Sequence, residues 1–161
     1  MHGRIVQNVY YLSLNYLLNK NATVLEKIKH FFIEYSNNYQ TCPYHGMDGS
    51  DEYFTFYSGR LQPQSLDESS LAVKIVVAYD IVYEDLSREE RAYIENNFLR
   101  PMYVTIKRNN AKESNWQSWH NAAMTGIGIA INDKEMVKYA VDGETNGFKF
   151  HHPQQKHSSG I

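Results

Sequence analysis

The sequence predicts an all-α chain, a partial α/α toroid built of antiparallel helical hairpins. Apolar residues recur at three- and four-residue spacing through most of the 161 residues. Four-residue capping patterns precede several of these runs, and short polar turns separate them. We expect residues 1–150 to form one incomplete toroid domain and residues 151–161, HHPQQKHSSGI, to form a flexible polar tail.

The first third of the chain predicts a helical hairpin followed by a long loop. Residues 4–19 carry an apolar stripe, and the pattern Thr23-Val24-Leu25-Glu26 matches a capping box at the start of a second helix that ends near residues 36–38. Residues 39–64 lack helical periodicity, and a stretch of this length inside a compact domain is typically functional or disordered. Its many Tyr and Phe residues favour an ordered loop.

This loop contains several side chains of the kind that bind metals. The spacing of Tyr44, His45, Asp48, Asp51 and Glu52 matches no typical zinc or calcium site. We therefore predict no metal ion and no cofactor.

Two further capping patterns, Ser65-Leu66-Asp67-Glu68 and Ser87-Arg88-Glu89-Glu90, each predict the start of a helix. Pro101 should kink the second of these helices or end it near Leu99. A helix over residues 113–131 and a shorter one from Lys134 to Val141 complete the pattern, and Asp142-Gly143 is a typical end for the shorter one.

The stretch Glu113–Ile131, ESNWQSWHNAAMTGIGIAI, is the most unusual part of the chain. At about 100° per residue, one helical face collects the following residues: Trp116, Trp119, His120, Ala123, Ile127 and Ala130. Asn115 lies at the edge of that face. Gly126 and Gly128 suggest close packing against a neighbouring helix, because glycine costs about 1 kcal/mol relative to alanine in a helix interior.

Two interpretations of this helix remain open on residue types alone. Indole rings stack on sugars, a neutral imidazole can accept a proton, and a carboxamide can hold a carboxylate, so the helix could line a sugar-binding site. Alternatively Trp116, Trp119 and His120 are core residues, since apolar helical stripes usually mark a core. Hydrolysis by paired carboxylates fits less well, because Glu113 is the only acid here.

The overall composition narrows the class of protein. The formal net charge is −2, with 16 basic and 18 acidic residues and no Lys/Arg-rich run, which argues against nucleic acid as a partner. No apolar run approaches the roughly 20 residues of a membrane span, and the N-terminal residues lack a signal-peptide core. Cys42 is the only cysteine, so no intrachain disulfide is expected. No esterase, nucleotide-phosphate or dinucleotide motif occurs.

Three stretches in the second half of the chain carry a resemblance to a known family. They are LAVKIVVAYDIVYEDLSREERAYIENNFLRPM, SNWQSWHNAAMTGIGIAINDKEMVKYAVDG and GFKF. In this order they resemble the helical domain of bacterial polysaccharide lyases of the heparinase II/III and alginate lyase type. The segment N-W-x-x-W-H-N is the most specific part of the resemblance.

The resemblance implies β-elimination on an acidic polysaccharide or oligosaccharide that contains uronic acid. By likeness, Asn115 would hold the uronate carboxylate, and His120 would help neutralise it or act as the base. Trp116 and Trp119 would shape the sugar subsites, with Asn121 supporting His120. Such proteins continue with more helices, a catalytic Tyr and a β-sandwich, so we expect this chain to be the N-terminal part of a periplasmic or secreted lyase. The alternative is a non-catalytic carbohydrate-binding or helical scaffold module.

Overall fold

The computed structural model describes residues 1–45, 57–109, 111 and 114–147. Within them the chain is built of helices, and the only strand-like pairing among these residues is an isolated bridge between His45 and Gly59. The all-α prediction is confirmed. The α-helices are α1 (His2–Asn19), α2 (Ala22–Asn38), α3 (Ser65–Val82), α4 (Arg88–Ile94), α5 (Arg100–Lys107), α6 (Asn115–Ala130) and α7 (Lys134–Asp142). The short elements are the 3-10 turns η1 (Tyr39–Thr41) and η2 (Tyr83–Asp85) and the π-helical stretch η3 (Glu95–Leu99).

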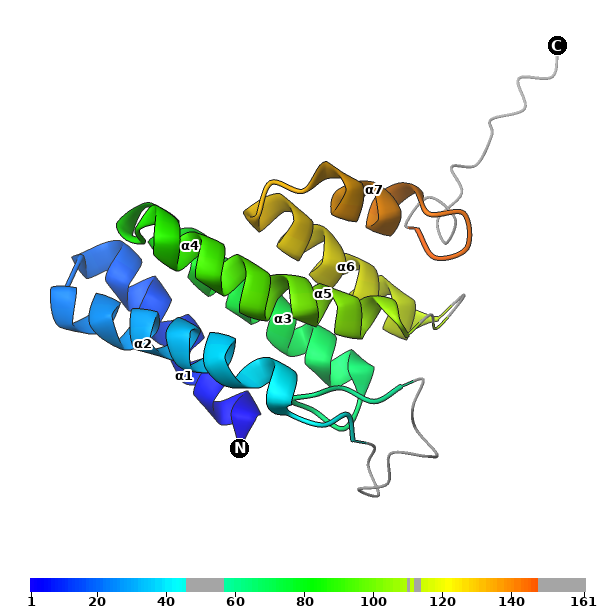
Figure 1. The fold of residues 1–161 in the computed structure, drawn as a ribbon, viewed down its shortest axis with the longest axis horizontal. Helices are drawn as coiled ribbons and strands as arrows, with labels where there is room; N and C mark the ends of the chain where they lie inside the picture. The colour runs from blue at the N-terminus through cyan, green and yellow to red at the C-terminus, as the bar shows by residue number, and fades with distance from the viewer. Residues whose placement is uncertain (46–56, 110, 112–113, 148–161) are drawn as a thin grey trace, which may run out of the picture.

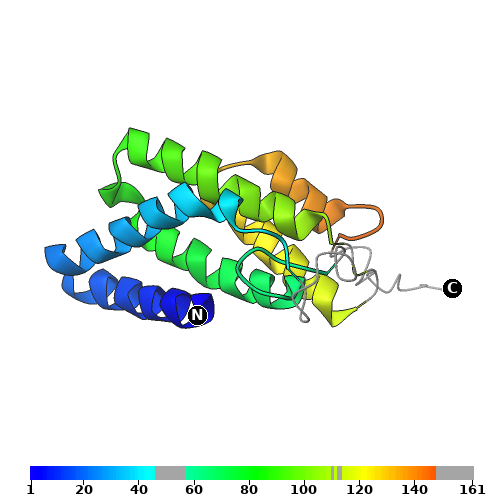
Figure 2. The same ribbon diagram turned by 60° about the horizontal axis from the view of Figure 1, so that its bottom comes forward.

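The helices form two layers (Figures 1 and 2). Helix α3 lies between α1 and α6 in one layer, while α2, the continuous α4–η3–α5 rod and α7 form the other. With the α4–η3–α5 rod counted as one helix, consecutive helices run antiparallel, so α1, α3 and α6 begin at the same end of the molecule at which α2, α5 and α7 finish (Figure 1). We call this end the α6 N-terminal end. A double layer of hairpins agrees with the expected architecture, and closure into a toroid stays a prediction.

Aromatic side chains fill the core between the two layers. The ring of Phe32 meets that of Tyr79 at 5.6 Å between centroids, and Tyr39 meets Phe98 at 5.3 Å. Both tyrosines are fully buried. Their hydroxyls donate to carboxylates, Tyr39 to Glu68 at 2.8 Å and Tyr79 to Glu95 at 2.9 Å. A buried phenol is tolerated because its polar end has a partner.

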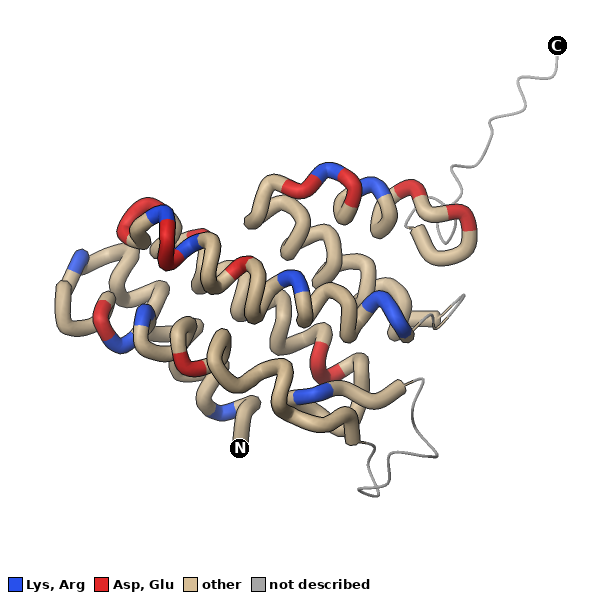
Figure 3. Tube along the Cα trace, in the orientation of Figure 1, with Lys and Arg blue, Asp and Glu red and all other residues tan. Residues whose placement is uncertain are grey.

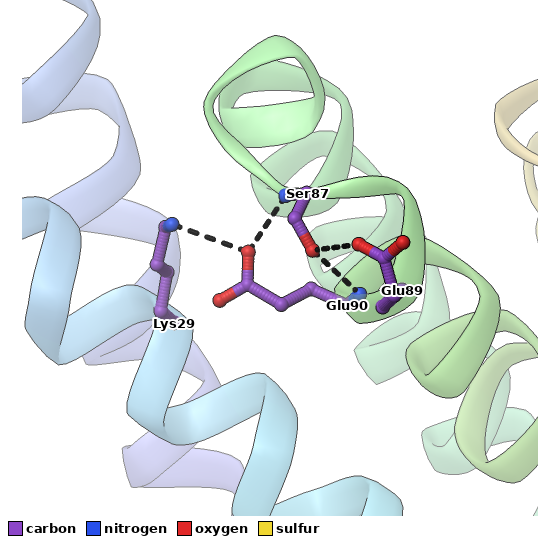
Figure 4. A network of polar contacts seen from close by, with 4 residues as sticks. All are labelled: Lys29, Ser87, Glu89 and Glu90. Atoms are coloured by element: carbon purple, nitrogen blue, oxygen red, sulfur yellow. Dashed lines mark hydrogen bonds and ion pairs between the residues drawn. The ribbon is translucent and has the colours of Figure 1, made fainter.

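The capping box at Ser87 is confirmed (Figure 4). Ser87 Oγ accepts a hydrogen bond from the Glu90 backbone N–H at 3.1 Å, and Glu90 Oε2 accepts one from the Ser87 N–H at 2.7 Å. The same Glu90 oxygen lies 3.3 Å from Lys29 Nζ. The start of α4 is therefore held to α2 as well as capped.

The other two predicted capping boxes are wrong. Helix α2 begins one residue earlier than Thr23 because Asn21, a residue type strongly preferred at this position, accepts from the N–H groups of Thr23 and Val24 at 2.9 and 3.3 Å. Helix α3 begins at Ser65 itself, after Gln64, which makes no side-chain cap. Glu68 does not reach back to a cap but points into the protein and is 0% exposed.

Glu68 is bound by three donors from two other segments. Its Oε2 accepts from the N–H groups of Leu61 and Gln62 at 2.9 and 3.0 Å, and its Oε1 accepts from Tyr39 Oη at 2.8 Å. Burial raises the pKa of this carboxyl although the three hydrogen bonds oppose the rise. The contacts fix the chain before α3 against the end of α2.

Pro101 does not end the helix that begins at Arg88. A proline removes a donor and clashes with the carbonyl four residues earlier. Here the preceding turn widens into η3, in which the Arg100 N–H donates to the Glu95 carbonyl five residues back. The rod continues through Pro101 to Lys107, so of the two predicted outcomes, a kink or an end near Leu99, the end is wrong and the helix is distorted instead. Helix α7 runs to Asp142 with Gly143 as its C-cap, as predicted.

The two glycines of α6 differ in what surrounds them. A Cβ on Gly128 would lie 2.9 Å from Val137 Cγ2 and 3.0 Å from Met136 Cβ of α7. A Cβ on Gly126 would lie 3.6 Å from Val76 Cγ2 of α3, an ordinary contact. The predicted close packing is thus confirmed at Gly128 alone.

These surroundings predict that an added methyl group destabilises the protein at Gly128 and stabilises it at Gly126. Gly128→Ala should lower the free energy of unfolding by about 1–3 kcal/mol, because α7 must move to admit it. Gly126→Ala, the matched control, should raise it by up to about 1 kcal/mol through helix propensity. Urea unfolding followed by circular dichroism measures both, and equal effects would contradict the packing described here.

Candidate functional site

An open hollow lies at the α6 N-terminal end. It has a volume of about 370 Å³ and is lined by Tyr57, Ala111, Ser114, Asn115 and Trp116. The rings of Tyr57 and Trp116 meet edge to face, with 5.6 Å between centroids and 83° between planes. A carboxamide and two aromatic rings thus border one hollow, and none of its lining residues that the structure describes is charged.

The predicted site residues divide into two groups. Asn115 and Trp116 line the hollow, and Trp119 lies one turn further along α6 with 46% of its surface exposed. His120 and Asn121 are fully buried. The prediction that Trp119 and His120 share one face is therefore wrong, because the two neighbouring side chains lie on opposite sides of the boundary between core and solvent.

The buried face of α6 is partly polar. Gln117 Oε1 accepts from the Ala111 N–H at 2.8 Å, and Gln117 Nε2 donates to Asn121 Oδ1 at 2.8 Å. Asn121 Nδ2 donates in turn to the Asn146 carbonyl, and Asn146 Nδ2 donates to the Tyr139 carbonyl at 3.2 Å. This row of amides connects the turn before α6 with the turn after α7, and it fixes the wall of the hollow at Ala111.

His120 lies in contact with the start of α3. Its Nε2 is 3.1 Å from Ser65 Oγ, and its Nδ1 has no hydrogen-bond partner among the described residues. Burial lowers the pKa of His120 to about 4, although the nearby backbone of Asn109 opposes the shift. The imidazole is therefore neutral near pH 7 and is covered by protein.

Sequence reasoning missed Gln117 and gave no role to Tyr57. A glutamine four residues before an asparagine in a helix is a common surface pair, and nothing local indicates that the partners would be Ala111 and Asn146. Tyr57 lies at the edge of the long loop and belongs to no motif. The loop residues Asp48, Asp51 and Glu52, weighed above as metal ligands, lie outside the described residues, as does the predicted tail of residues 151–161.

A second cavity, of about 200 Å³, lies between the start of α1 and the end of α2. Its accessible surface is mostly apolar, although the lining includes His2, Glu34 and Asn38 beside Ile5, Tyr35 and Leu61. Such a surface suits an apolar group rather than a hydrated, charged sugar.

In the described part of the chain no three His, Cys, Asp or Glu side chains gather as they would around a metal ion. The described helices are also too short or too polar to cross a bilayer.

Comparison with known proteins decides the family. The alginate lyase family model matches residues 2–155. This chain belongs to the alginate lyase family. An alginate lyase from Stenotrophomonas maltophilia (strain K279a) is 26% identical over 152 residues, which cover 92% of this chain and 20% of that protein. The chain thus spans about one fifth of the length of this relative. Of the two kinds of lyase that the sequence resembles, the comparisons confirm the alginate lyase kind, and the likeness to heparinase II/III stays a prediction.

The enclosure of His120 predicts acid sensitivity of the fold. In the folded protein the pKa of His120 is about 4, below the usual 6.5. Between these two pH values the folded state therefore binds fewer protons than the unfolded state. The free energy of unfolding consequently falls as the pH drops from 6.5 towards 4. When the pH is lowered from 7 to 5, the titration of His120 alone should reduce the free energy of unfolding by about 2 kcal/mol.

Urea titrations at the two pH values, in wild type and His120→Gln, measure this loss. The variant should lack it, while His30→Gln, at an exposed position of α2, should keep it. A pH dependence that is identical in all three proteins would show that His120 is not the group responsible.

Proposed function

We propose that this chain is the N-terminal part of a polysaccharide lyase that cleaves a uronic-acid-containing glycan by β-elimination. Membership of the alginate lyase family supports the reaction class. The observation that carries the proposal to particular residues is the hollow in which Asn115 and Trp116 meet Tyr57. Acidic polysaccharides or oligosaccharides are the proposed partners, and the periplasm or the exterior is the proposed location of the whole enzyme.

The reaction sets three requirements. The C5–H bond of the uronate breaks as a base takes the proton, the C4–O bond breaks as an acid protonates the departing oxygen, and a C4=C5 double bond forms. The carboxylate next to C5 must be neutralised, because negative charge develops on it when the proton leaves. Fixed donors directed at that developing charge typically supply the largest part of the rate enhancement.

In this proposal Asn115 supplies such a donor. Its side chain is exposed in the first turn of α6, where free backbone N–H groups and the helix dipole also favour a negative group. The rings of Trp116 and Tyr57 offer apolar faces and edges for the sugar, and the exposed Trp119 extends this surface by one turn.

We infer a positioning role for His120 in place of direct proton transfer. A neutral imidazole can accept a proton, but a base must come within hydrogen-bond reach of the proton it removes. The full burial of His120 and its contact with Ser65 favour a group that holds the start of α6 against α3. Asn121 supports the same region through Gln117 and Asn146, not through His120.

The proposal predicts a large loss of activity from one small change. In the intact enzyme, Asn115→Ala should lower kcat on a polyuronate by about 100- to 1000-fold, as expected for removal of one donor to a developing charge. Growth of the ultraviolet absorbance of unsaturated uronate measures the rate. Asn8→Ala, at an exposed position of α1, should leave it unchanged.

Circular dichroism separates this outcome from misfolding. If Asn115→Ala loses helical signal in parallel with activity, Asn115 acts in folding and the proposed role is wrong.

The second candidate is a carbohydrate-binding module without catalysis. The enclosure of His120 beside an accessible aromatic surface favours it. Retention of polyuronate by the intact protein with no unsaturated product would establish this alternative.

A further inference from the structure

Two arginines lie over the ring of one tyrosine at the α6 N-terminal end. The guanidinium carbon of Arg60 lies 4.2 Å from the centroid of the Tyr44 ring, and that of Arg108 lies 3.7 Å from the same centroid. The three residues come from three segments: the chain after η1, the chain before α3, and the residue that follows α5. We call them the arginine–tyrosine stack.

Two members of the stack, Arg60 and Tyr44, are held in place by further contacts. Arg60 Nη1 donates to the carbonyls of Gln40, at 2.9 Å, and Cys42. Tyr44 Oη lies 3.4 Å from Oγ1 of the buried Thr105 of α5. All three residues are half-buried, so part of the stack is accessible to solvent.

The stack concentrates positive charge. Burial raises the pKa of the Tyr44 phenol, but the hydrogen bonds of Thr105 and Arg108 and the charge of Arg60 outweigh it and lower that pKa overall. Among the described residues no carboxylate lies within ion-pair distance of Arg60. Planar guanidinium groups are well matched to carboxylates, which they can bind through two parallel hydrogen bonds.

Among the described residues, the hollow at Asn115 lacks the charge that the stack provides. Helix α6 carries no charged residue, as its unbroken tan colour in Figure 3 shows, and neither does the described lining of the hollow. Arg108 precedes Ala111 of that lining by three residues, which limits the separation of their Cα atoms to about 11 Å. An anionic chain that fills the hollow therefore passes near the stack.

We propose that the arginine–tyrosine stack binds a carboxylate of the acidic saccharide, as a subsite separate from Asn115. This inference rests on the proposed function, because it assigns the same saccharide to both places. The alternative role for the stack is a purely structural one, in which Arg60 and Arg108 only fasten the ends of the long loop. The two roles differ in whether the guanidinium groups respond to a ligand.

Nuclear magnetic resonance of the protein labelled with ¹⁵N at Arg and Trp tests the inference. Addition of an oligouronate should shift the Nε–Hε signals of Arg60 and Arg108. The carboxyl-reduced oligosaccharide, and acetate at the same carboxylate concentration, should leave them in place. Unmoved arginine signals in the presence of the oligouronate would overturn the inference, and so would equal shifts with acetate, which would indicate a simple anion site.

A matched pair of variants tests the energetics. Arg108→Gln should weaken oligouronate binding about tenfold, as expected for loss of one charge-assisted contact. Lys107→Gln removes the same charge one residue away, from a side chain that lies 4.2 Å from the Tyr139 ring instead, and it should change affinity far less. Equal weakening by both variants would overturn the inference in favour of a diffuse charge effect.

The Trp116 indole signal and the unsaturated product report separately on the proposed function. A shift of the indole together with product formation, but with unmoved arginines, overturns the subsite alone. Arginine shifts without any product overturn the catalytic proposal and leave the subsite standing.

Discussion

The buried carboxylate of Glu68 determines how the α6 N-terminal end is built. A carboxylate removed from water is stable only if hydrogen bonds replace the water it loses. Glu68 obtains them from Leu61, Gln62 and Tyr39, so the chain that enters α3 is bound to the end of α2. This arrangement places Arg60 beside Tyr44 and sets Ser65 against His120. Both the stack and the support beneath α6 depend on it.

In the proposed function, the same end of the molecule separates two tasks that a single charged pocket would combine. The hollow offers aromatic edges and a neutral amide, whereas positive charge lies on the stack beside it. A neutral surface imposes little desolvation cost when a sugar ring covers it. Guanidinium groups that keep contact with water can still attract a polyanion over a distance set by ionic strength.

Periodicity predicted the helices well, because their burial follows the repeat of the α-helix. The capping pattern was right at Ser87 and wrong at Thr23 and Ser65, and local chemistry explains only part of this. Asn21 is a visible competitor in the sequence, but the donors that draw Glu68 inward come from residues 39 to 62. The roles of the site residues stay predictions, but their positions can be compared. Of the two positions considered for Trp119, facing a sugar or facing the core, the structure shows the exposed one. The distant partners that turn Gln117 and Asn121 inward leave no local trace in the sequence.

The widened turn η3 also determines what lies beyond it on the rod. One extra residue in a helix rotates everything downstream by about 100°. In this phase Arg100 Nη1 meets Asp133 Oδ2 at 2.7 Å, and Asp133 also caps α7 by accepting from the Met136 N–H. A regular helix through Pro101, one residue shorter, would direct Arg100 away from Asp133. The irregular turn thus sets the rotation of α5 about the helix axis, so that Arg100 faces the α6–α7 hairpin.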